Sequence, residues 1–239
     1  MKLKALILAA GKGTRMKSDL PKVIHKVNGI PMVKKILNEL EKLETEENIL
    51  ILGHKKEEVL KELGDVKYVV QEEQLGTGHA IMQAYELLKD YDGDVMILCG
   101  DTPLLRHETL KEMYEAHKKS GVATTILTSI YDNPFGYGRI VKDGDKVKAI
   151  VEEKEADEET KKIKEVNAGV YCCNAKELFE ALKKVTNNNE KGEFYLTDIV
   201  GIQVGEGKTV ASFVLADNEE ILGVNSKVCL LYTSDAADD

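Results

Sequence analysis

The segment Leu8-Ala9-Ala10-Gly11-Lys12-Gly13-Thr14-Arg15-Met16 decides how the chain begins to fold. It joins an apolar run, residues 6–10, to a basic turn that contains two glycines. The run is too continuous for a half-exposed strand, so we expect a buried strand here. Glycines directly after a strand allow main-chain N–H groups to approach an anion closely. The segment therefore predicts a buried strand that ends at an anion-binding loop.

This loop fits neither of two common nucleotide-binding patterns. The spacing GxxxxGK[ST] does not fit, and Met16 stands where GxGxxG requires a glycine. Residues 11–26 nevertheless hold five lysines and arginines against one acidic residue, in a chain of net charge −9. A local positive excess at the carboxyl end of a strand favours a bound polyphosphate. The alternative is a solvated loop with ordinary surface lysines.

Short apolar runs and amphipathic segments alternate along the first half of the chain. Buried strands are expected at 49–52, 66–70 and 95–99, and helices over 32–43 and 80–91. Such alternation predicts right-handed βαβ units and an α/β fold with a mostly parallel sheet.

The second half has a different pattern. Residues 140–141 and 146–151 flank Asp143-Gly144-Asp145, which is typical of a hairpin turn. A strand is expected over 165–173 and a helix over 175–184. We therefore predict one domain with two lobes, residues 1 to about 105 and about 106 to 228.

Composition excludes several classes of protein. The chain has 239 residues, with 33 Lys and Arg against 42 Asp and Glu, and 43% hydrophobic residues. The acidic balance argues against nucleic acid or an anionic membrane as a partner, and the apolar content argues against disorder. No run approaches the roughly 20 apolar residues that span a membrane.

The four cysteines show no metal-binding spacing. Adjacent Cys172 and Cys173 would point to opposite faces of a strand, as suits two unpaired thiols. The simplest compartment is the reducing cytoplasm.

Seven motifs, in order, resemble those of sugar nucleotidyltransferases, which join a nucleoside triphosphate to a sugar 1-phosphate. The first motif comprises residues 8–16 with Leu20-Pro21-Lys22. The second comprises residues 71–80. It is similar to the uracil-reading segment of the GlmU family, the bacterial bifunctional N-acetylglucosamine-1-phosphate uridyltransferases. The others are residues 100–104, 136–140, 151–154, 166–169 and 223–225. The resemblance covers about Lys4 to Lys227. It implies a Rossmann-like nucleotidyltransferase fold, a mostly parallel mixed central sheet flanked by helices.

The resemblance also implies the roles of individual residues. Arg15 and Lys22 would be catalytic, because they stabilise charge on the triphosphate, and Asp101 with Asn225 would hold Mg²⁺. A single carboxylate at a strand end suits Mg²⁺, which keeps several waters. The alternative for Asp101 is a helix N-cap or a turn residue. The substrate-binding positions are Leu8, Ala9, Ala10, Gly11, Lys22, Gln71, Gly76, Thr77, Cys99, Gly100, Asp101, Gly138, Glu152, Asn167 and Asn225.

Two groups among these positions have distinct chemistry. A glutamine such as Gln71 can pair with the carbonyl–amide edge of uracil, while Gly76 and Gly78 permit a close backbone approach. The alternative is a loop in which Thr77 caps the next helix. Gly138, Glu152 and Asn167 match sugar-reading positions and suit hydroxyl and N-acetyl groups; the alternative is ordinary hairpin polarity.

Some residues depart from the family pattern or show no pattern. Cys99 and Ala168 stand where many relatives are expected to have Tyr and Thr, and Cys99 puts one uridine contact in doubt. The five histidines show no metal-ligand spacing and are interpreted as structural or surface groups.

The function that the resemblance implies is uridylyl transfer from UTP to N-acetylglucosamine 1-phosphate. The products are UDP-N-acetylglucosamine, a precursor for peptidoglycan and lipopolysaccharide of the cell wall, and pyrophosphate. One alternative is another sugar-1-phosphate nucleotidyltransferase that uses glucose 1-phosphate or dTTP. The other is a non-catalytic protein that binds nucleotide sugars.

The end of the chain does not resemble the continuation of bifunctional relatives, which form a trimeric acetyltransferase β-helix. Residues 229–239 show no six-residue period, and about 14 residues after Asn225 cannot supply stacked repeats. We expect an atypical tail of no function, no acetyltransferase activity and a monomer, whereas full-length relatives would be trimers.

Overall fold

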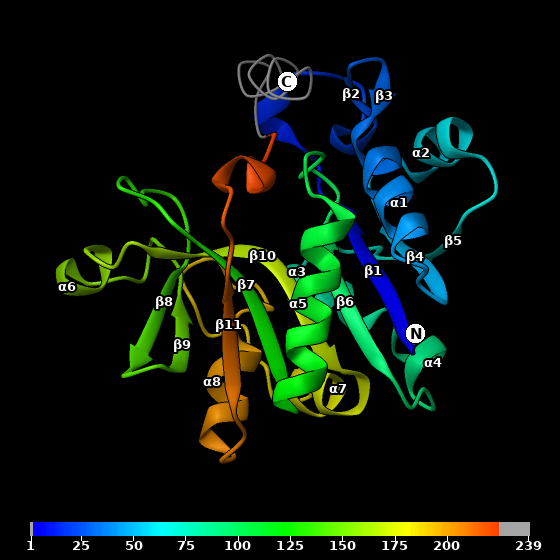
Figure 1. The fold of residues 1–239 in the computed structure, drawn as a ribbon. Coiled ribbons are helices and arrows are strands. Elements are labelled where there is room, and N and C mark those ends of the chain that lie inside the picture. Colours follow the sequence, from blue (N-terminus) through cyan, green and yellow to red (C-terminus); the bar gives the residue numbers. More distant parts are fainter. Residues whose placement is uncertain (1, 225–239) are drawn as a thin grey trace.

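A mixed β-sheet lies at the centre of the molecule, with helices on both of its faces (Figure 1). The computed structural model describes residues 2–224. Asn225 and the expected tail, residues 229–239, lie outside the described residues. Within the described residues the large sheet has nine strands, in the order β11-β7-β10-β6-β1-β4-β5, with the β8–β9 hairpin joined to β10. Its strands are β1 (Leu3–Ala9), β4 (Glu47–Leu52), β5 (Lys67–Val70), β6 (Asp94–Cys99), β7 (Thr124–Ile130), β8 (Arg139–Asp143), β9 (Lys146–Val151), β10 (Glu165–Asn174) and β11 (Val210–Val214).

The first half of the chain has the parallel arrangement that strand–helix alternation predicts. Strand β1 pairs in parallel with both β4 and β6, and β5 pairs in parallel with β4. The carboxyl ends of β1 and β6 therefore lie side by side. The predicted buried strands over 49–52, 66–70 and 95–99 are confirmed, with shifts of one to two residues at their starts.

Strands from the second half of the chain make the sheet mixed. Strand β10 runs antiparallel to both β6 and β7, and β11 lies parallel to β7 at the edge. The predicted hairpin is confirmed as β8 and β9, and the strand predicted over 165–173 is β10. The β10–β7 register shifts between Asn167 and Tyr171, where Gly169 has a φ of +76°. This irregularity lies directly in one of the motifs.

The helices divide between the two faces. Helices α1, α2 and α5 share one buried cluster with the sheet, and α3, α4, α7 and α8 share another. The helix predicted over 80–91 is two shorter ones, because 3₁₀-type bonds from Gln83 N and Ala84 N interrupt it. The helices are α1 (Met32–Lys42), α2 (Lys56–Leu63), α3 (Thr77–Met82), α4 (Tyr85–Leu88), α5 (His107–Ser120), α6 (Glu158–Lys161), α7 (Ala175–Leu182) and α8 (Asp198–Gly205), with 3₁₀ turns η1 (Thr14–Met16), η2 (Lys22–Ile24) and η3 (Asn218–Ile221) and a small β2 (Lys26–Val27) and β3 (Ile30–Pro31) ribbon.

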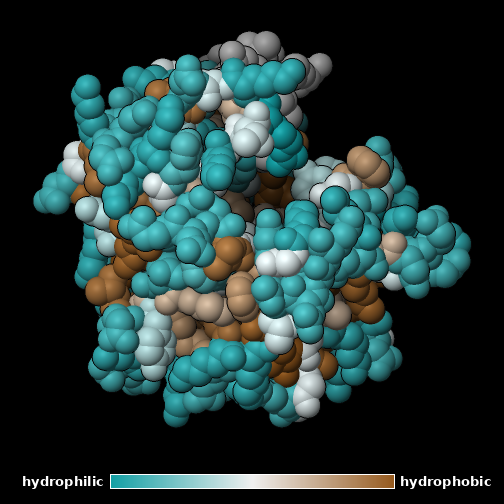
Figure 2. Space-filling model, turned by 180° about the vertical axis from the view of Figure 1, so that it is seen from behind, coloured by the Kyte–Doolittle hydropathy of each residue, from teal (hydrophilic) through white to brown (hydrophobic). Residues whose placement is uncertain are grey.

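Adjacent residues of one strand enter different halves of the core. Cys172 packs into the cluster under α1 and α5, whereas Cys173 packs into the cluster under α7 and α8. These separate clusters confirm the prediction that the two side chains point to opposite faces of the strand, and both thiols are free. Among residues 2–224, no helix is long and apolar enough to cross a membrane. Seen from behind, the surface is mostly hydrophilic, and hydrophobic residues show mainly in its hollows (Figure 2).

Candidate nucleotide and sugar site

A cavity of about 300 Å³ opens at the carboxyl ends of β1 and β6. Open α/β sheets bind ligands at this edge, because the loops that follow parallel strands meet there. Ten of the residues that the sequence singles out line it, and they come from four separate segments of the chain. These residues are Leu8, Ala9, Ala10, Gly11, Lys22, Gln71, Gly76, Thr77, Cys99 and Asp101.

Lys22 and Asp101 meet on one side of this cavity. The ammonium of Lys22 forms an ion pair with Oδ2 of Asp101, and the two side chains are 14% and 22% exposed. Lys22 begins η2, and Asp101 lies in a turn two residues after β6. Asp101 therefore does not cap α5, because Arg106 occupies the N-cap of that helix.

Gly13 allows the first loop to fold onto Lys22. Its φ is +59°, and a Cβ at this position would lie 2.7 Å from Cβ of Lys22. Gly100 has a similar function behind the cavity, where its N–H donates to the carbonyl of Leu8 at 2.9 Å. A Cβ on Gly100 would lie 2.9 Å from that carbonyl oxygen. Both glycines therefore serve close packing of the loops that carry the charged pair.

Arg15 lies apart from the cavity lining. It is exposed on the 3₁₀ turn η1, one residue before the buried Met16. Among the described residues, the lining set includes Lys22 but not Arg15. The structure thus brings only one of the two predicted catalytic cations to the cavity wall.

The opposite side of the cavity is built by the loop before α3. Gln71 is buried, and its Nε2 donates to the carbonyl of Gly76 at 3.0 Å. Gly76 has a φ of +111°, and a Cβ there would lie 2.5 Å from the carbonyl oxygen of Phe194. The close backbone approach expected at Gly76 and Gly78 is therefore made by the chain's own segment, since Gly78 N donates to Phe194 O at 2.8 Å.

Thr77 does not cap α3. Its Oγ1 accepts from the backbone N–H of Leu196 at 3.0 Å, and α3 has no side-chain cap. The capping interpretation is wrong because a distant segment, rather than the first turn of the helix, supplies the donor. Thr77 instead joins the loop before α3 to residues 194–196.

Gly138, Glu152 and Asn167 form a second group, beside the register shift of β10. Asn167 N donates to Gly138 O at 2.9 Å, and a Cβ on Gly138 would lie 3.6 Å from Oε1 of Glu152. Oε1 of Glu152 accepts from Oγ1 of Thr197 at 3.3 Å. Burial raises the pKa of the Glu152 carboxyl, although the Thr197 hydrogen bond opposes this. The group offers a carboxylate, an amide and a backbone without a Cβ, which suit hydroxyl and amide groups of a ligand.

Cys99 connects the two groups. It ends β6 at the cavity wall, and its Sγ donates to Gly169 O at 3.5 Å. Gly169 N in turn donates to Oδ1 of Asn167 at 2.9 Å. Burial, together with the nearby Asp101 carboxylate, raises the pKa of the Cys99 thiol to about 12. The thiol is therefore neutral and acts as a packing group and weak donor.

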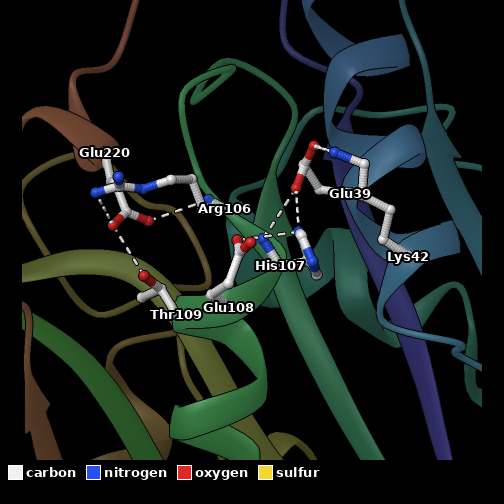
Figure 3. A network of polar contacts seen from close by, with 7 residues as sticks. All are labelled: Glu39, Lys42, Arg106, His107, Glu108, Thr109 and Glu220. Atoms are coloured by element: carbon white, nitrogen blue, oxygen red, sulfur yellow. Dashed lines mark hydrogen bonds and ion pairs between the residues drawn. The ribbon is translucent and has the colours of Figure 1, made fainter.

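A buried carboxylate, Glu220, contacts the residues at the start of α5 (Figure 3). Glu220 accepts from Arg106 N at 3.0 Å, from Nη2 of Arg106 at 2.8 Å and from Oγ1 of Thr109 at 2.8 Å. These bonds join η3 to the start of α5. Four residues after Glu220, Val224 N donates to Asp101 O at 2.9 Å. The segment that leaves η3 is thus fastened beside the turn that carries Asp101.

The carboxylates available to a metal differ in their surroundings. Asp101 offers carboxylate oxygen at the cavity, which is the chemistry that Mg²⁺ prefers, and its Oδ2 is paired with Lys22. Its predicted partner Asn225 lies outside the described residues.

Glu39, His107 and Glu108 each have a possible ligand atom, and these three atoms lie within 4.8 Å of one another. There, however, Glu39 accepts from His107 N at 3.0 Å and pairs with Lys42 at 2.6 Å (Figure 3). Those bonds and ion pairs lower the pKa of Glu39 against the effect of its burial. These contacts hold the start of α5 against α1, which agrees with the structural interpretation of His107.

Four lining residues were missed: Val23, Gln74, Ala80 and Glu193. Three of them lie within or beside segments that the motifs already marked. Glu193 carries no local signal, because it reaches the cavity only through the pairing of Phe194 N with Leu75 O at 2.8 Å.

Residues 4–223 match the family model described as nucleotidyl transferase. The chain is 49% identical over 230 residues to the protein named bifunctional protein GlmU of Acetivibrio thermocellus, and 50% identical over 228 residues to that of Enterococcus faecalis. Each alignment covers 95% of this chain and 50% of the relative. The chain therefore spans about half the length of the curated relatives it matches.

Two solved structures share the fold. A putative glucose-1-phosphate thymidylyltransferase from Bacillus anthracis, in complex with sucrose, superposes with a TM-score of 0.80 at 19% identity and covers 99% of this chain and 96% of its own. A UDP-glucose pyrophosphorylase complexed with UDP-glucose superposes with a TM-score of 0.76 at 20% identity and covers 100% of this chain and 99% of its own.

Proposed function

The chain belongs to the nucleotidyl transferase family, and from this premise we propose that it transfers a uridylyl group from UTP to N-acetylglucosamine 1-phosphate. The products are UDP-N-acetylglucosamine and pyrophosphate. The observation that carries the proposal is the single cavity that collects ten motif residues from four segments. About 50% identity to GlmU proteins supports the choice of reaction within the family. The compartment that we propose is the cytoplasm.

The proposed reaction needs no nucleophile from the protein. An oxygen of the sugar phosphate attacks the α-phosphorus of UTP in line, and pyrophosphate leaves. Catalysis then consists of holding the two substrates in line and stabilising the negative charge that develops. Lys22 lies at the cavity wall and donates to that charge, while main-chain N–H groups of the loop after β1, which lines the cavity at Ala10 and Gly11, bind phosphate oxygens.

Asp101, with Asn225 according to the family resemblance, would hold Mg²⁺, which neutralises phosphate charge when it is bound. In the described structure the ammonium of Lys22 pairs with the Asp101 carboxylate, the same carboxylate that would hold the metal. Asp101 would hold the metal, and Lys22 beside it would donate to the triphosphate. Arg15, on the exposed η1 turn, acts on the same triphosphate from outside the cavity wall.

The two halves of the site divide the recognition of the substrates. Gln71, Gly76 and Thr77 face the uracil, and Gly138, Glu152 and Asn167 bind the sugar. Cys99 lies between the two groups and would contact the uridine. Because its thiol is a weak donor, the binding energy for the nucleotide rests mainly on the base and the phosphates.

One assay separates this proposal from its alternatives. The purified chain is given UTP or dTTP with N-acetylglucosamine 1-phosphate or glucose 1-phosphate, and released pyrophosphate is measured with and without Mg²⁺. We expect Mg²⁺-dependent release to be fastest with UTP and the acetylated sugar. Preference for dTTP or glucose 1-phosphate would identify another sugar nucleotidyltransferase. Calorimetric binding of UDP-N-acetylglucosamine without any pyrophosphate release would identify a non-catalytic binder.

A further inference from the structure

The orientation of the Gln71 side-chain amide is fixed by its neighbours. The carbonyl oxygen of Gly76 can only accept, so the amide atom that lies 3.0 Å from it must be the nitrogen, Nε2. The same Nε2 lies 3.1 Å from Nδ1 of His79. An amide nitrogen has two hydrogens, and these two contacts use both of them.

His79 must therefore accept a hydrogen bond through Nδ1. A proton on that nitrogen would place two donors against each other and push the Gln71 amide away. Gln83 Nε2 donates to the backbone carbonyl of His79 at 2.9 Å. A neutral imidazole that accepts through Nδ1 carries its proton on Nε2, so the 3.3 Å between Nε2 of the ring and Nε2 of Gln83 separates two donors and is not a hydrogen bond. The 3.1 Å contact at Nδ1 is the shorter of the two. The ring of Phe194 lies beside the imidazole, with 6.3 Å between the ring centroids.

This arrangement leaves Oε1 as the polar atom that the Gln71 amide offers to a ligand. Gln71 lines the cavity and is only 3% exposed, so it cannot turn to solvent to change what it presents. An acceptor at this place pairs with the N3–H of uracil or thymine. Cytosine carries an unprotonated nitrogen at the same ring position, which would set two acceptors against each other.

We propose that His79 is a positioning residue for base selection: it locks the Gln71 amide so that its oxygen selects bases with an N3–H and rejects cytosine. This inference rests on the proposed function for the location of the base. Both residues lie within one sequence motif, residues 71–80, but they meet only because the chain turns between them and brings His79 beside Gln71.

The test compares three variants. His79→Ala removes the acceptor, whereas His79→Asn replaces it, since the amide oxygen of Asn can occupy the place of Nδ1. His54→Ala is the matched control, because His54 is an exposed histidine that does not line the cavity. Steady-state kinetics with UTP and with CTP at saturating N-acetylglucosamine 1-phosphate give the ratio of kcat/KM for the two nucleotides.

We expect His79→Ala to lower the UTP-to-CTP ratio by about 10-fold and to raise KM for UTP by about 5- to 10-fold, the loss of one buried hydrogen bond. The KM for the sugar phosphate and the midpoint of thermal unfolding should stay unchanged. His79→Asn should keep the ratio within about 3-fold of wild type, and His54→Ala should not change it. A ratio unchanged in His79→Ala, or lost equally in His79→Asn, would overturn the proposal.

The outcome separates this inference from the proposed function. If the wild-type chain releases no pyrophosphate, the function fails, and calorimetric binding of UTP and CTP to the same variants then tests His79. Wild type that binds UTP more tightly than CTP, with the difference lost only in His79→Ala, supports the inference. Equal binding of UTP and CTP by wild type contradicts it.

Discussion

Oε1 of Glu220 lies 2.8 Å from Nη2 of Arg106, and only 4% of the glutamate is exposed although the two residues are 114 positions apart. Its other oxygen accepts from Arg106 N, at the first turn of α5. A carboxylate at a helix N-terminus is stabilised by the helix dipole as well as by the unpaired N–H groups. Glu220 thus closes the start of α5 and holds η3 against the turn that leads from Asp101.

Glu220→Gln should lower the free energy of unfolding by about 1 to 3 kcal/mol, because it weakens three hydrogen bonds to a charged group. Urea denaturation measures this change. Glu219→Gln is the control, since Glu219 is exposed on the same turn and its change should stay within about 0.5 kcal/mol. Equal effects of the two variants would mean that the Arg106 contacts do not stabilise the fold.

Lys22→Ala and Arg15→Ala should each lower kcat by about 10²- to 10³-fold, the cost of removing one preorganised charge donor. Lys26→Ala is the control from the same basic stretch, because Lys26 pairs with Glu62 and is 54% exposed. We expect that variant to retain the wild-type rate within a few-fold. Turnover near wild type in both Lys22→Ala and Arg15→Ala would remove these residues from the mechanism.

Asp101→Asn should abolish most of the activity, because the predicted Mg²⁺ site would lose its only described carboxylate. A rise in Mg²⁺ concentration should restore part of the rate, since mass action offsets weaker ligation. A titration of activity against Mg²⁺ gives the apparent affinity of each protein. Normal activity of Asp101→Asn at low Mg²⁺ would refute the assignment.

Gly76→Ala should destabilise the protein by about 2 to 4 kcal/mol, because the φ of +111° is strained for alanine and the new Cβ would lie 2.5 Å from Phe194 O. Gly201→Ala is the opposite control. It lies in α8, where a Cβ would meet no atom within 4 Å, so alanine should stabilise by about 0.5 to 1 kcal/mol. Chemical denaturation of both variants checks the two signs.

Gln203→Met should stabilise the protein by about 1 kcal/mol or more. Gln203 is fully buried in α8, and neither Nε2 nor Oε1 has a hydrogen-bond partner among residues 2–224. Replacing a buried unpaired amide by an apolar chain of similar length removes its desolvation cost. A lower urea midpoint for this variant would reveal a partner for the amide.

Glu152→Gln should stabilise the fold more at about pH 8 than at about pH 4.5. Burial raises the pKa of Glu152 above its ordinary value of 4.5, so the folded state binds this proton more tightly than the unfolded state. Its contribution to stability is present at low pH and is lost as pH rises through the raised pKa. Glutamine cannot ionise and avoids that loss. The same stability difference at both pH values would contradict the raised pKa.

The sequence by itself determined the elements that have a strong local pattern. The apolar runs of β1, β4 and β6 and the hairpin around Gly144 follow from residues close together in the chain. Because parallel strands place their carboxyl ends at one edge, Gly11 and Asp101 could be brought to one site before any contact was known. The apolar-run criterion does not predict strand β7, because polar threonine and serine side chains interrupt its run of apolar residues, and no element is predicted from the sequence at the amphipathic α5.

Only the tertiary structure decided which distant segments complete the site. Glu193 reaches the cavity and Phe194 O lies against Gly78 N because backbone groups pair across more than a hundred residues. The same holds for Glu220 and Arg106, and Arg15 lies outside the wall that the motif predicted for it. Local periodicity indicates which face of a helix or strand is buried, but it carries no information on which other segment of the chain packs against that face. That choice depends on packing and on pairing every buried polar group, which are properties of the whole fold.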